Sequence, residues 1–508
     1  MAAVASSTSS STPPPEKDSA TFCLGGHVDA GKATLVGHLL VLLRQADVAQ
    51  YVEPSQAIGK ASFKYAWIVG QRTASERERG ITIDLHSATM ETNRMRVKWQ
   101  VPPSHRDFIR SFCKGVNQSD CLVLVVAAAQ GEFEAGLSRH GQTREHALIA
   151  FALAGIRRAL VVVNKMDTNS VIFSQERYQE IVDETGQVLT KIGYTSVQFV
   201  PVSAWAGDNM VVKSERLPWY NGPTLVEALE SQAAQVSRDL ASKQLHLKPA
   251  RFLVSNVLYR PDQQQKATDG AVRVIVTGLV AQGVFRVGDA VTIAPHDRDP
   301  ATWGATIASI EENHTRCESA GPGSIVGFAI AGLAPAAFRL MRSGVVLGHR
   351  KSYAPPDSAP AFVAQIIIMQ HPGAAGLRIG YTPVMQIGSA QVSVTWTRFL
   401  HKLDRRTGAV TETCPAELRT GDAAVVEMVP TQPVCVECFS DAPALGRFFI
   451  RDLRTTVAIG IIMNVTLGPD AKWHRRKVCL LIRFCSRNRF RDAFSVWNIM
   501  VNTSHFLA

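Results

Sequence analysis

Residues 26–33 read Gly-His-Val-Asp-Ala-Gly-Lys-Ala, and this stretch decides the fold. It matches the phosphate-binding loop G-x-x-x-x-G-K-[ST] at every position except the last. An apolar run, TFCLG, precedes the loop, and a stretch of helical character follows it. In such a unit the glycines let backbone N–H groups turn inward around phosphates, and the helix N-terminus adds positive potential. The stretch predicts a nucleotide site, with an ordinary glycine-rich turn as the alternative.

Further motifs predict that the nucleotide carries guanine. Asp167, in the segment NKMD after an apolar run, can accept hydrogen bonds from guanine N1–H and the exocyclic amine, which adenine cannot supply. The backbone N–H of Ala204, after the next apolar run, can meet the guanine carbonyl. Lys32 is placed to reach the β- and γ-phosphates, and Thr82 in ERERGITID is the candidate that senses the γ-phosphate and the metal. The residues expected to bind the nucleotide are Gly26, His27, Val28, Asp29, Ala30, Gly31, Lys32, Ala33, Thr34, Asn164, Lys165, Asp167, Ser203, Ala204 and Trp205.

Length and composition indicate a globular protein of several domains. The 508 residues are enough for about three domains, and 46% hydrophobic with 19% charged residues is not a disordered composition. No run reaches the roughly 18 apolar residues that a membrane span needs, so we expect no membrane partner. The net charge of +11 and a pI near 9.3 favour an acidic partner such as a nucleic acid.

Nine cysteines without framework spacing fit reduced thiols in a cytosolic protein, so we expect a cytoplasmic location. The close pair Cys435 and Cys438 has no second pair or histidine that would complete a zinc site. We therefore interpret both as core residues of a strand.

The order of apolar runs predicts the architecture. Continuous runs at residues 121–129, 159–165 and 198–205 are typical of strands buried on both faces, and helical stretches separate them. After residue 247 the runs become short and alternating, which is typical of antiparallel barrels. We expect an α/β P-loop GTPase domain with a doubly wound, mostly parallel sheet, followed by two antiparallel β-barrel domains. The expected segments are a disordered leader (1–21), the GTP-binding domain (22–240), two barrels (245–350 and 359–466) and a divergent basic tail (467–508).

These motifs belong to a longer pattern that resembles the eukaryotic elongation factor 1-alpha family of translational GTPases. The pattern runs from about Phe22 to Val465 and includes GHVDAGK, ERERGITIDL, HRDFIRSF, GLSRHGQTREHALIAF, NKMD, SAWAGDNM and RDLRTTVAIG. The resemblance implies a protein that, with GTP bound, delivers aminoacyl-tRNA or a tRNA-shaped protein to the ribosomal A site. It also implies GTP and GDP as ligands, the ribosome as partner and a guanine-nucleotide exchange factor.

The branch within the family stays open on the sequence. The segment GHVDAGKATLVGHLL is similar to the ribosome-rescue GTPase that partners a Pelota-like protein. The segment GLSRHGQTREHAL and the third domain are similar to elongation factor 1-alpha itself. Two other interpretations remain: a degenerate relative that acts as an RNA- or ribosome-binding module, and an interaction protein that uses the barrels alone.

The chain departs from the family pattern at the metal. Ala33 occupies the position of the Ser or Thr whose hydroxyl ligates Mg²⁺, and the four residues before His105 are Val-Pro-Pro-Ser where the family has D-A-P-G. The Asp that holds Mg²⁺ through water is thus Val101, and the Gly that meets the γ-phosphate is Ser104. His105 matches the histidine that orients the attacking water, and it is the candidate catalytic residue.

These departures predict weak metal affinity and slow GTP hydrolysis, because Mg²⁺ neutralises much of the transition-state charge in phosphoryl transfer. Thr34 follows Ala33, but on a helix its side chain points about 100° away. The alternative is that a neighbouring carboxylate such as Asp29 compensates. The tail after about Gly468 mixes Lys and Arg with Trp and Phe, which fits RNA binding or a poorly ordered, artefactual end.

Overall fold

The computed structural model describes most of the chain between residues 17 and 466. The described ranges are 17–57, 59, 61–70, 73–79, 82–138, 141–259, 272–295, 305–313, 315–333, 341–349, 361–370, 376–405, 407–452 and 455–466. The predicted basic tail (467–508) and most of the predicted leader lie outside these residues. In the described part, no helix is both long and apolar enough to span a bilayer.

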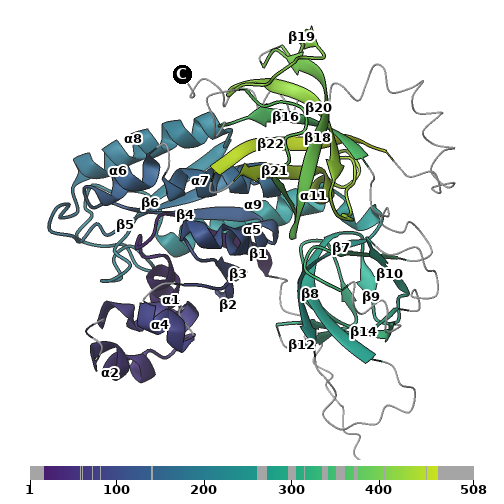
Figure 1. Ribbon diagram of the computed structural model, residues 1–508. Helices are drawn as coiled ribbons and strands as arrows, with labels where there is room; N and C mark the ends of the chain where they lie inside the picture. Colours follow the sequence, from purple (N-terminus) through teal and green to yellow (C-terminus); the bar gives the residue numbers. More distant parts are fainter. Residues whose placement is uncertain are drawn as a thin grey trace, which may run out of the picture.

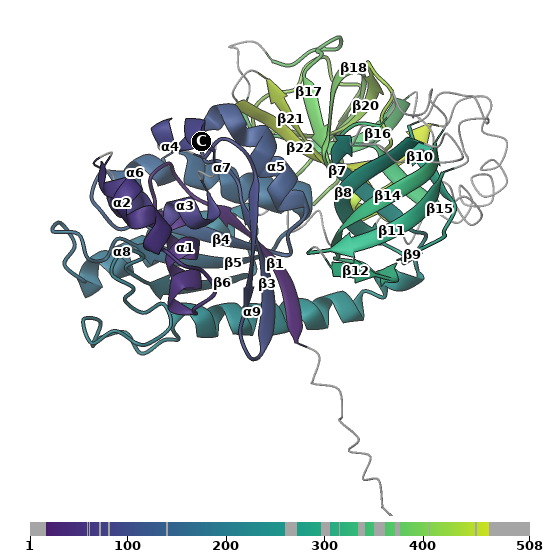
Figure 2. The same cartoon turned by 90° about the horizontal axis from the view of Figure 1, so that it is seen from below.

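The first domain is a six-stranded sheet covered by helices on both faces (Figures 1 and 2). Its strand order is β2-β3-β1-β4-β5-β6, and every pairing is parallel except that of β2 with β3. The strands are β1 (Asp18–Gly25), β2 (His86–Glu91), β3 (Met95–Val101), β4 (Cys121–Ala127), β5 (Arg158–Asn164) and β6 (Ser196–Pro201). The helices are α1 (Lys32–Leu42), α2 (Ala49–Ala57), η1 (Ala61–Lys64), α3 (Ala66–Val69), α4 (Ala74–Arg79), η2 (Arg106–Phe108), α5 (Ile109–Asn117), α6 (Glu132–Leu137), α7 (Gln142–Ile149), η3 (Ala150–Ala154), α8 (Gln175–Ile192), α9 (Leu225–Ser242) and η4 (Leu245–Leu247).

Successive residues of the central strands belong to different cores, as two-sided burial requires. In β4, Leu122 and Leu124 pack with α5, α7 and α8, whereas Val123 and Val125 pack with α1 and α9. The expected doubly wound, mostly parallel sheet is therefore confirmed.

The first strand begins earlier than the sequence suggests. Residues 18–21 were expected in the disordered leader, but they form the start of β1. Asp18 and Ala20 pair in parallel register with Met95 and Val97 of β3. Composition near the polar N-terminus gives no sign of this pairing, because the partner strand lies about 75 residues further along the chain.

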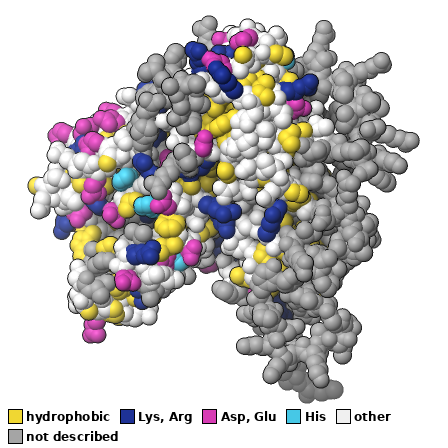
Figure 3. Space-filling model, viewed as in Figure 1, with side chains coloured by type: hydrophobic (Ala, Val, Ile, Leu, Met, Phe, Trp, Pro, Cys, Tyr) yellow, Lys and Arg dark blue, Asp and Glu magenta, His cyan; other side chains and the backbone are white. Residues whose placement is uncertain are grey.

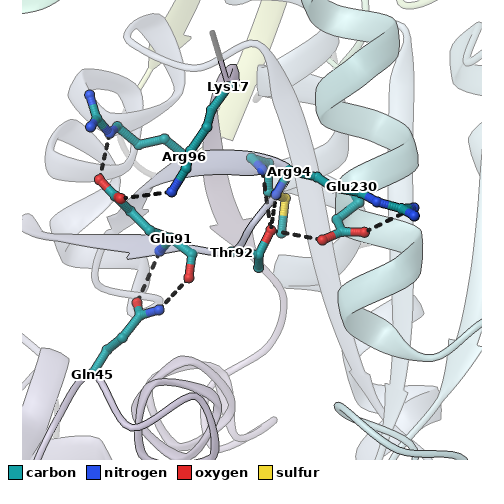
Figure 4. A network of polar contacts seen from close by, with 8 residues as sticks. Lys17, Gln45, Glu91, Thr92, Arg94, Arg96 and Glu230 are labelled. Atoms are coloured by element: carbon teal, nitrogen blue, oxygen red, sulfur yellow. Dashed lines mark hydrogen bonds and ion pairs between the residues drawn. The ribbon is translucent and has the colours of Figure 1, made fainter. Parts of the chain in front are cut away.

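A network of hydrogen bonds and ion pairs joins the β2–β3 hairpin to neighbouring parts of the first domain (Figure 4). It lies at the end of the sheet that is remote from the phosphate loop. Thr92 Oγ1 donates to Glu230 Oε1 on α9 at 2.7 Å, and Glu91 pairs with Arg96 at 2.6 Å and Lys17 at 3.3 Å. These contacts tie the hairpin to α9 and to the start of β1. Since most of these side chains are exposed, each ion pair contributes little to stability.

The second domain is an antiparallel β domain with its own core. Seven of its nine strands form a sheet in the order β10-β15-β7-β8-β14-β11-β12, and β9 pairs with β13 in a separate two-stranded sheet. An isolated bridge between Ala290, next to β10, and Thr306 of β11 joins the two sides of the larger sheet. The strands are β7 (Arg251–Tyr259), β8 (Val272–Gln282), β9 (Phe285–Arg286), β10 (Val291–Ala294), β11 (Thr306–Glu312), β12 (Thr315–Cys317), β13 (Ser319–Ala320), β14 (Ile325–Leu333) and β15 (Val346–His349). The core centres on stacked Phe252 and Phe328, whose ring centroids are 4.2 Å apart.

The third domain is a closed antiparallel barrel. Strands β17-β21-β22-β16-β20-β18 follow one another, β18 pairs back to β17 to close the ring, and β19 attaches to β18. The elements are β16 (Ala361–Ile368), β17 (Val384–Ile387), β18 (Ala390–Leu403), β19 (Val410–Thr413), β20 (Ala423–Pro430), α11 (Pro443–Gly446), β21 (Arg447–Asp452) and β22 (Thr455–Thr466).

The interpretation of Cys435 and Cys438 as strand residues is wrong. Both lie in the connection between β20 and α11. Cys435 is buried with Leu253 and Val346 of the second domain, so it belongs to a small apolar contact between the two β domains. Within the described residues, no group of three His, Cys, Asp or Glu side chains could hold a metal ion.

The first and third domains share one hydrophobic core. Phe449 and Ile461 of the barrel belong to the same buried cluster as Phe112 of α5 and Phe151 of η3. Polar contacts accompany this core, among them Arg447 Nη1 donating to the Ala154 carbonyl at 3.2 Å. The barrel therefore packs on α5 and η3 of the first domain (Figure 1).

Candidate nucleotide-binding site

The phosphate loop turns from β1 into α1 through two glycines that no other residue could replace. Gly26 has φ 130°, and a Cβ there would lie 2.1 Å from the Val125 carbonyl oxygen. Gly31 has φ 89°, and a Cβ there would lie 2.3 Å from Asn164 Nδ2. Both close approaches are to groups held in the sheet, so substitution would displace the loop. Helix α1 begins directly after Gly31, which directs its N-terminus at the loop.

Lys32 lies inside this loop. Its Nζ donates to the carbonyl oxygen of Gly26 at 3.3 Å and also to that of His27. Burial lowers the pKa of Lys32 to about 7; Asp29 opposes this shift and Lys165 adds to it. The loop thus holds its lysine among backbone oxygens, at the place where phosphates are expected.

Two side chains that are not among the predicted nucleotide-binding residues support the loop from α7. Gly26 N–H donates to His146 Nδ1 at 3.1 Å, and Val28 N–H donates to Gln142 Oε1 at 3.2 Å. His146 is buried and stacked on Phe112 at 4.0 Å, and burial, with a smaller contribution from Lys32, lowers its pKa to about 3. A neutral imidazole can accept the Gly26 N–H. Gln142 and His146 are four residues apart and so lie on one face of α7, but this spacing does not indicate that they contact the phosphate loop.

Asn164 joins the phosphate loop to the guanine-reading segments. Its Nδ2 donates to the Ala30 carbonyl at 2.8 Å, and its Oδ1 accepts from Ala204 N–H at 2.9 Å. The Ala204 N–H was expected to meet the guanine carbonyl, and in this structure Asn164 takes it. Both contacts are buried, so the three segments form one unit.

Aromatic side chains stand beside the guanine-reading segments. Trp205 is 45% exposed and makes an edge contact with Tyr65, whose ring stacks on His38 at 4.0 Å. His38 Nδ1 lies 2.7 Å from the Ala204 carbonyl oxygen, and Lys64 Nζ lies 5.3 Å from the Trp205 ring centroid. The segment around Tyr65 carries no nucleotide motif, which is why its part in this wall was missed.

One cavity of about 560 Å³ brings these segments together. A volume of this order suits a small ligand such as a nucleotide. Its lining includes thirteen of the predicted residues: Val28, Asp29, Gly31, Lys32, Ala33, Thr34, Thr82, His105, Asn164, Lys165, Asp167, Ala204 and Trp205. Four others, Gly26, His27, Ala30 and Ser203, do not line it, and Phe63, Ala66, Val101, Pro102, Ser104 and Thr168 complete the wall.

The segment that carries Thr82 is organised by one buried carboxylate. Glu76 accepts hydrogen bonds from Ile83 N–H at 2.9 Å and Asp84 N–H at 3.3 Å, and it lies 2.9 Å from His86 Nε2. Burial alone would raise the pKa of Glu76, but its hydrogen bonds, including those from Thr73, outweigh burial and lower the pKa to about 2. Glu76 therefore stays ionised and holds the backbone next to Thr82.

His105 lines the cavity. It caps η2, where its Nδ1 accepts from Asp107 N–H at 3.3 Å, and its side chain is 48% exposed. Ser104 precedes it and also lines the cavity. The ring therefore belongs to the cavity lining and is also accessible to solvent.

The residues beside Thr82 do not fit a magnesium ion. A point at Cβ distance from Gly70 lies 3.1 Å from Thr82 Oγ1, 3.3 Å from Ala33 Cβ and 3.7 Å from the Ala66 carbonyl oxygen, so the Thr82 hydroxyl and the Ala33 methyl group border the same small space. Val101, at the end of β3, is 1% exposed and lines the same cavity. Mg²⁺ requires near-octahedral oxygen ligands and in most sites one or two carboxylates. Two of the three positions expected to supply oxygen here supply hydrocarbon.

Comparisons with known proteins agree with this geometry. Residues 17–235 match the family model described as Elongation factor Tu GTP binding domain, and residues 361–463 match the one described as GTP-eEF1A C-terminal domain-like. The chain is 42% identical over 445 residues to elongation factor 1-alpha of Staphylothermus marinus, which covers 87% of this chain and 95% of that protein. It is 39% identical over 467 residues to elongation factor 1-alpha of Aspergillus oryzae, and this match covers 89% of this chain and 95% of that protein. The Ski7 GTPase-like domain of S. cerevisiae, solved with GTP, has the same fold, with a TM-score of 0.69 at 16% identity over 87% of this chain and 97% of that one.

Proposed function

The chain belongs to the elongation factor 1-alpha family of translational GTPases, and from this premise we propose that it binds guanine nucleotide and carries a tRNA or a tRNA-shaped protein to the ribosomal A site. The cavity that combines Lys32, Asn164 and Asp167 is the observation that supports this function. Such a carrier acts in the cytoplasm with the ribosome, and a guanine-nucleotide exchange factor would reload it.

The partner is decided by a pull-down with protein loaded with a non-hydrolysable GTP analogue. Retention of aminoacyl-tRNA supports delivery in elongation. Retention of a Pelota-like protein supports ribosome rescue, the alternative favoured by the segment around the phosphate loop. If neither is retained while nucleotide stays bound, the carrier function is wrong and a degenerate RNA- or ribosome-binding module takes its place.

Charge alone does not identify the partner surface. The net charge is +11, but on the described part of the face in Figure 3, Lys and Arg lie in several separate groups with acidic side chains among them. Binding measured at several salt concentrations separates phosphate contacts, which weaken steeply with salt, from apolar ones.

GTP hydrolysis by this chain is slow, we further propose, because Ala33 and Val101 replace metal ligands and Ser104 replaces the family's glycine. The water-orienting His105 is present, so the loss falls on charge neutralisation rather than on the nucleophile.

A revertant tests this: Ala33→Ser/Val101→Asp/Ser104→Gly should hydrolyse GTP on the order of tenfold faster or more in single turnover on stalled ribosomes. Adding His105→Ala to the revertant is the control and should remove the gain. Equal rates for the natural chain and the revertant would contradict impaired hydrolysis.

A further inference from the structure

We infer that this cavity takes the guanine nucleotide in its metal-free form, so that Mg²⁺ weakens nucleotide binding instead of strengthening it. The inference rests on the proposed guanine-nucleotide site and specifies which ionic species of the nucleotide that site accepts.

The first ground is the donor set where the metal would lie. Thr82 and Ala33 both line the cavity and border the same small space, where Thr82 Oγ1 and Ala33 Cβ lie 3.1 and 3.3 Å from the point that a Cβ on Gly70 would occupy, so Ala33 brings a methyl group to this space instead of a hydroxyl. Val101 and Pro102 continue the wall, and both are buried. The side of the cavity next to Thr82 is therefore largely hydrocarbon.

The second ground is the cost of bringing a hydrated cation against such a wall. Mg²⁺ gives up its water reluctantly and keeps several water molecules that need hydrogen-bond acceptors. Ala33 and Val101 offer none, and packing an ion's water shell against apolar groups leaves its polar atoms unsatisfied. The cation is thus disfavoured here even when phosphate oxygens are present.

The third ground is that the loop supplies phosphate neutralisation of its own. The Nζ of Lys32 lies among the carbonyl oxygens of Gly26 and His27, and the N-terminus of α1 points at the same place. Inward-facing N–H groups and a lysine hold phosphates without a metal. The phosphate end of the cavity therefore supplies a cation and a helix N-terminus of its own, next to the Asp29 carboxylate.

The sign of the magnesium effect follows from mass action. Free nucleotide in solution binds Mg²⁺, so a protein that accepts only the metal-free form competes with the ion for its ligand. A site with intact metal ligands gains affinity when Mg²⁺ is added. Here the apparent Kd for GDP and for a non-hydrolysable GTP analogue should rise on the order of tenfold between EDTA and excess Mg²⁺ at matched ionic strength.

Equilibrium binding of both nucleotides to the full chain, with Mg²⁺ titrated, is the test. The expected result is an apparent Kd that increases with Mg²⁺ for the natural chain and decreases with Mg²⁺ for Ala33→Ser/Val101→Asp. The matched control Ala33→Ser/Val101→Asn has the same size without the charge and should lack most of the reversal. Binding of each variant in EDTA reports that its cavity is intact.

A natural chain that binds more tightly with Mg²⁺, or equally well with and without it, overturns the inference. Asp29→Asn then shows whether that carboxylate binds the metal, because the response of the apparent Kd to Mg²⁺ would disappear in this variant. Absence of guanine-nucleotide binding in both EDTA and Mg²⁺ is a different failure, since it overturns the proposed nucleotide site itself.

Discussion

Lys32 shows how a single buried charge couples nucleotide binding to pH. Burial lowers its pKa to about 7, Asp29 opposes that shift and Lys165 adds to it. The neighbouring His27 and His146 are kept neutral by burial and by the Lys32 charge. A neutral Lys32 binds phosphate poorly, whereas bound phosphates favour its charged form. Nucleotide binding should therefore take up a proton at Lys32.

The prediction is that affinity for GDP falls as pH rises above about 7, by up to tenfold per pH unit. The sign follows because the free protein must gain a proton to bind, and that proton becomes harder to obtain as pH rises. Calorimetry in two buffers of different ionisation enthalpy, at about pH 7.5 and 8.5 where the phosphates are already ionised, measures this uptake. Zero proton uptake would contradict the assignment to Lys32.

At the scale of elements, α7 and η3 together contact both the phosphate loop and the third domain. The helix continues through η3 and ends at Gly155 with φ 66°. A Cβ at Gly155 would lie 1.7 Å from Arg447 Nη1, and Arg447 donates to the adjacent Ala154 carbonyl. Burial lowers the pKa of Arg447 to about 10, so this contact is a closely packed one.

Gly155→Ala should destabilise the protein by about 1–3 kcal/mol, because it forces an alanine into the left-handed region and displaces Arg447. The matched control is Gly186→Ala within α8, where φ is helical and the nearest atom to a new Cβ is 3.8 Å away. That change should stabilise by about 0.5–1 kcal/mol. Thermal unfolding measures both, and a Gly155→Ala protein as stable as the natural chain would refute the packing argument.

At the scale of the whole molecule, one buried hydrophobic cluster crosses a domain boundary. The buried cluster beneath α5 and η3 includes Phe449 and Ile461 from the third domain. The second domain has a separate core around Phe252 and Phe328. Cooperative unfolding follows shared burial, so the first and third domains should unfold together.

Phe449→Ala should lower the stability of the first and third domains jointly by about 3–5 kcal/mol, since it removes a buried ring from their common core. Hydrogen exchange should accelerate in both β4 and β16. Phe328→Ala, the control, should accelerate exchange in β14 and leave β4 unchanged. If Phe449→Ala affects β16 alone, the two domains are not one cooperative unit.

Local spacing and side-chain chemistry were enough to predict those parts of the site whose residues lie within a few positions of one another in the sequence. The phosphate loop and the segment with Asp167 were predictable because backbone turns and guanine-reading carboxylates need particular residues at short intervals. The departures Ala33 and Val101 were visible for the same reason. The doubly wound sheet followed from runs buried on both faces.

The tertiary structure alone decided what depends on residues that meet across long stretches of chain. No local pattern pairs Gly26 with His146 or Asn164 with both Ala30 and Ala204, and none extends β1 back to Asp18 or takes Cys435 out of a strand. The physical reason is that such contacts are chosen by packing, which a linear pattern does not encode. The sequence by itself determined that guanine nucleotide is the expected ligand and that metal ligands are missing, and only the fold brought the Ala33 methyl group and Thr82 together in one cavity.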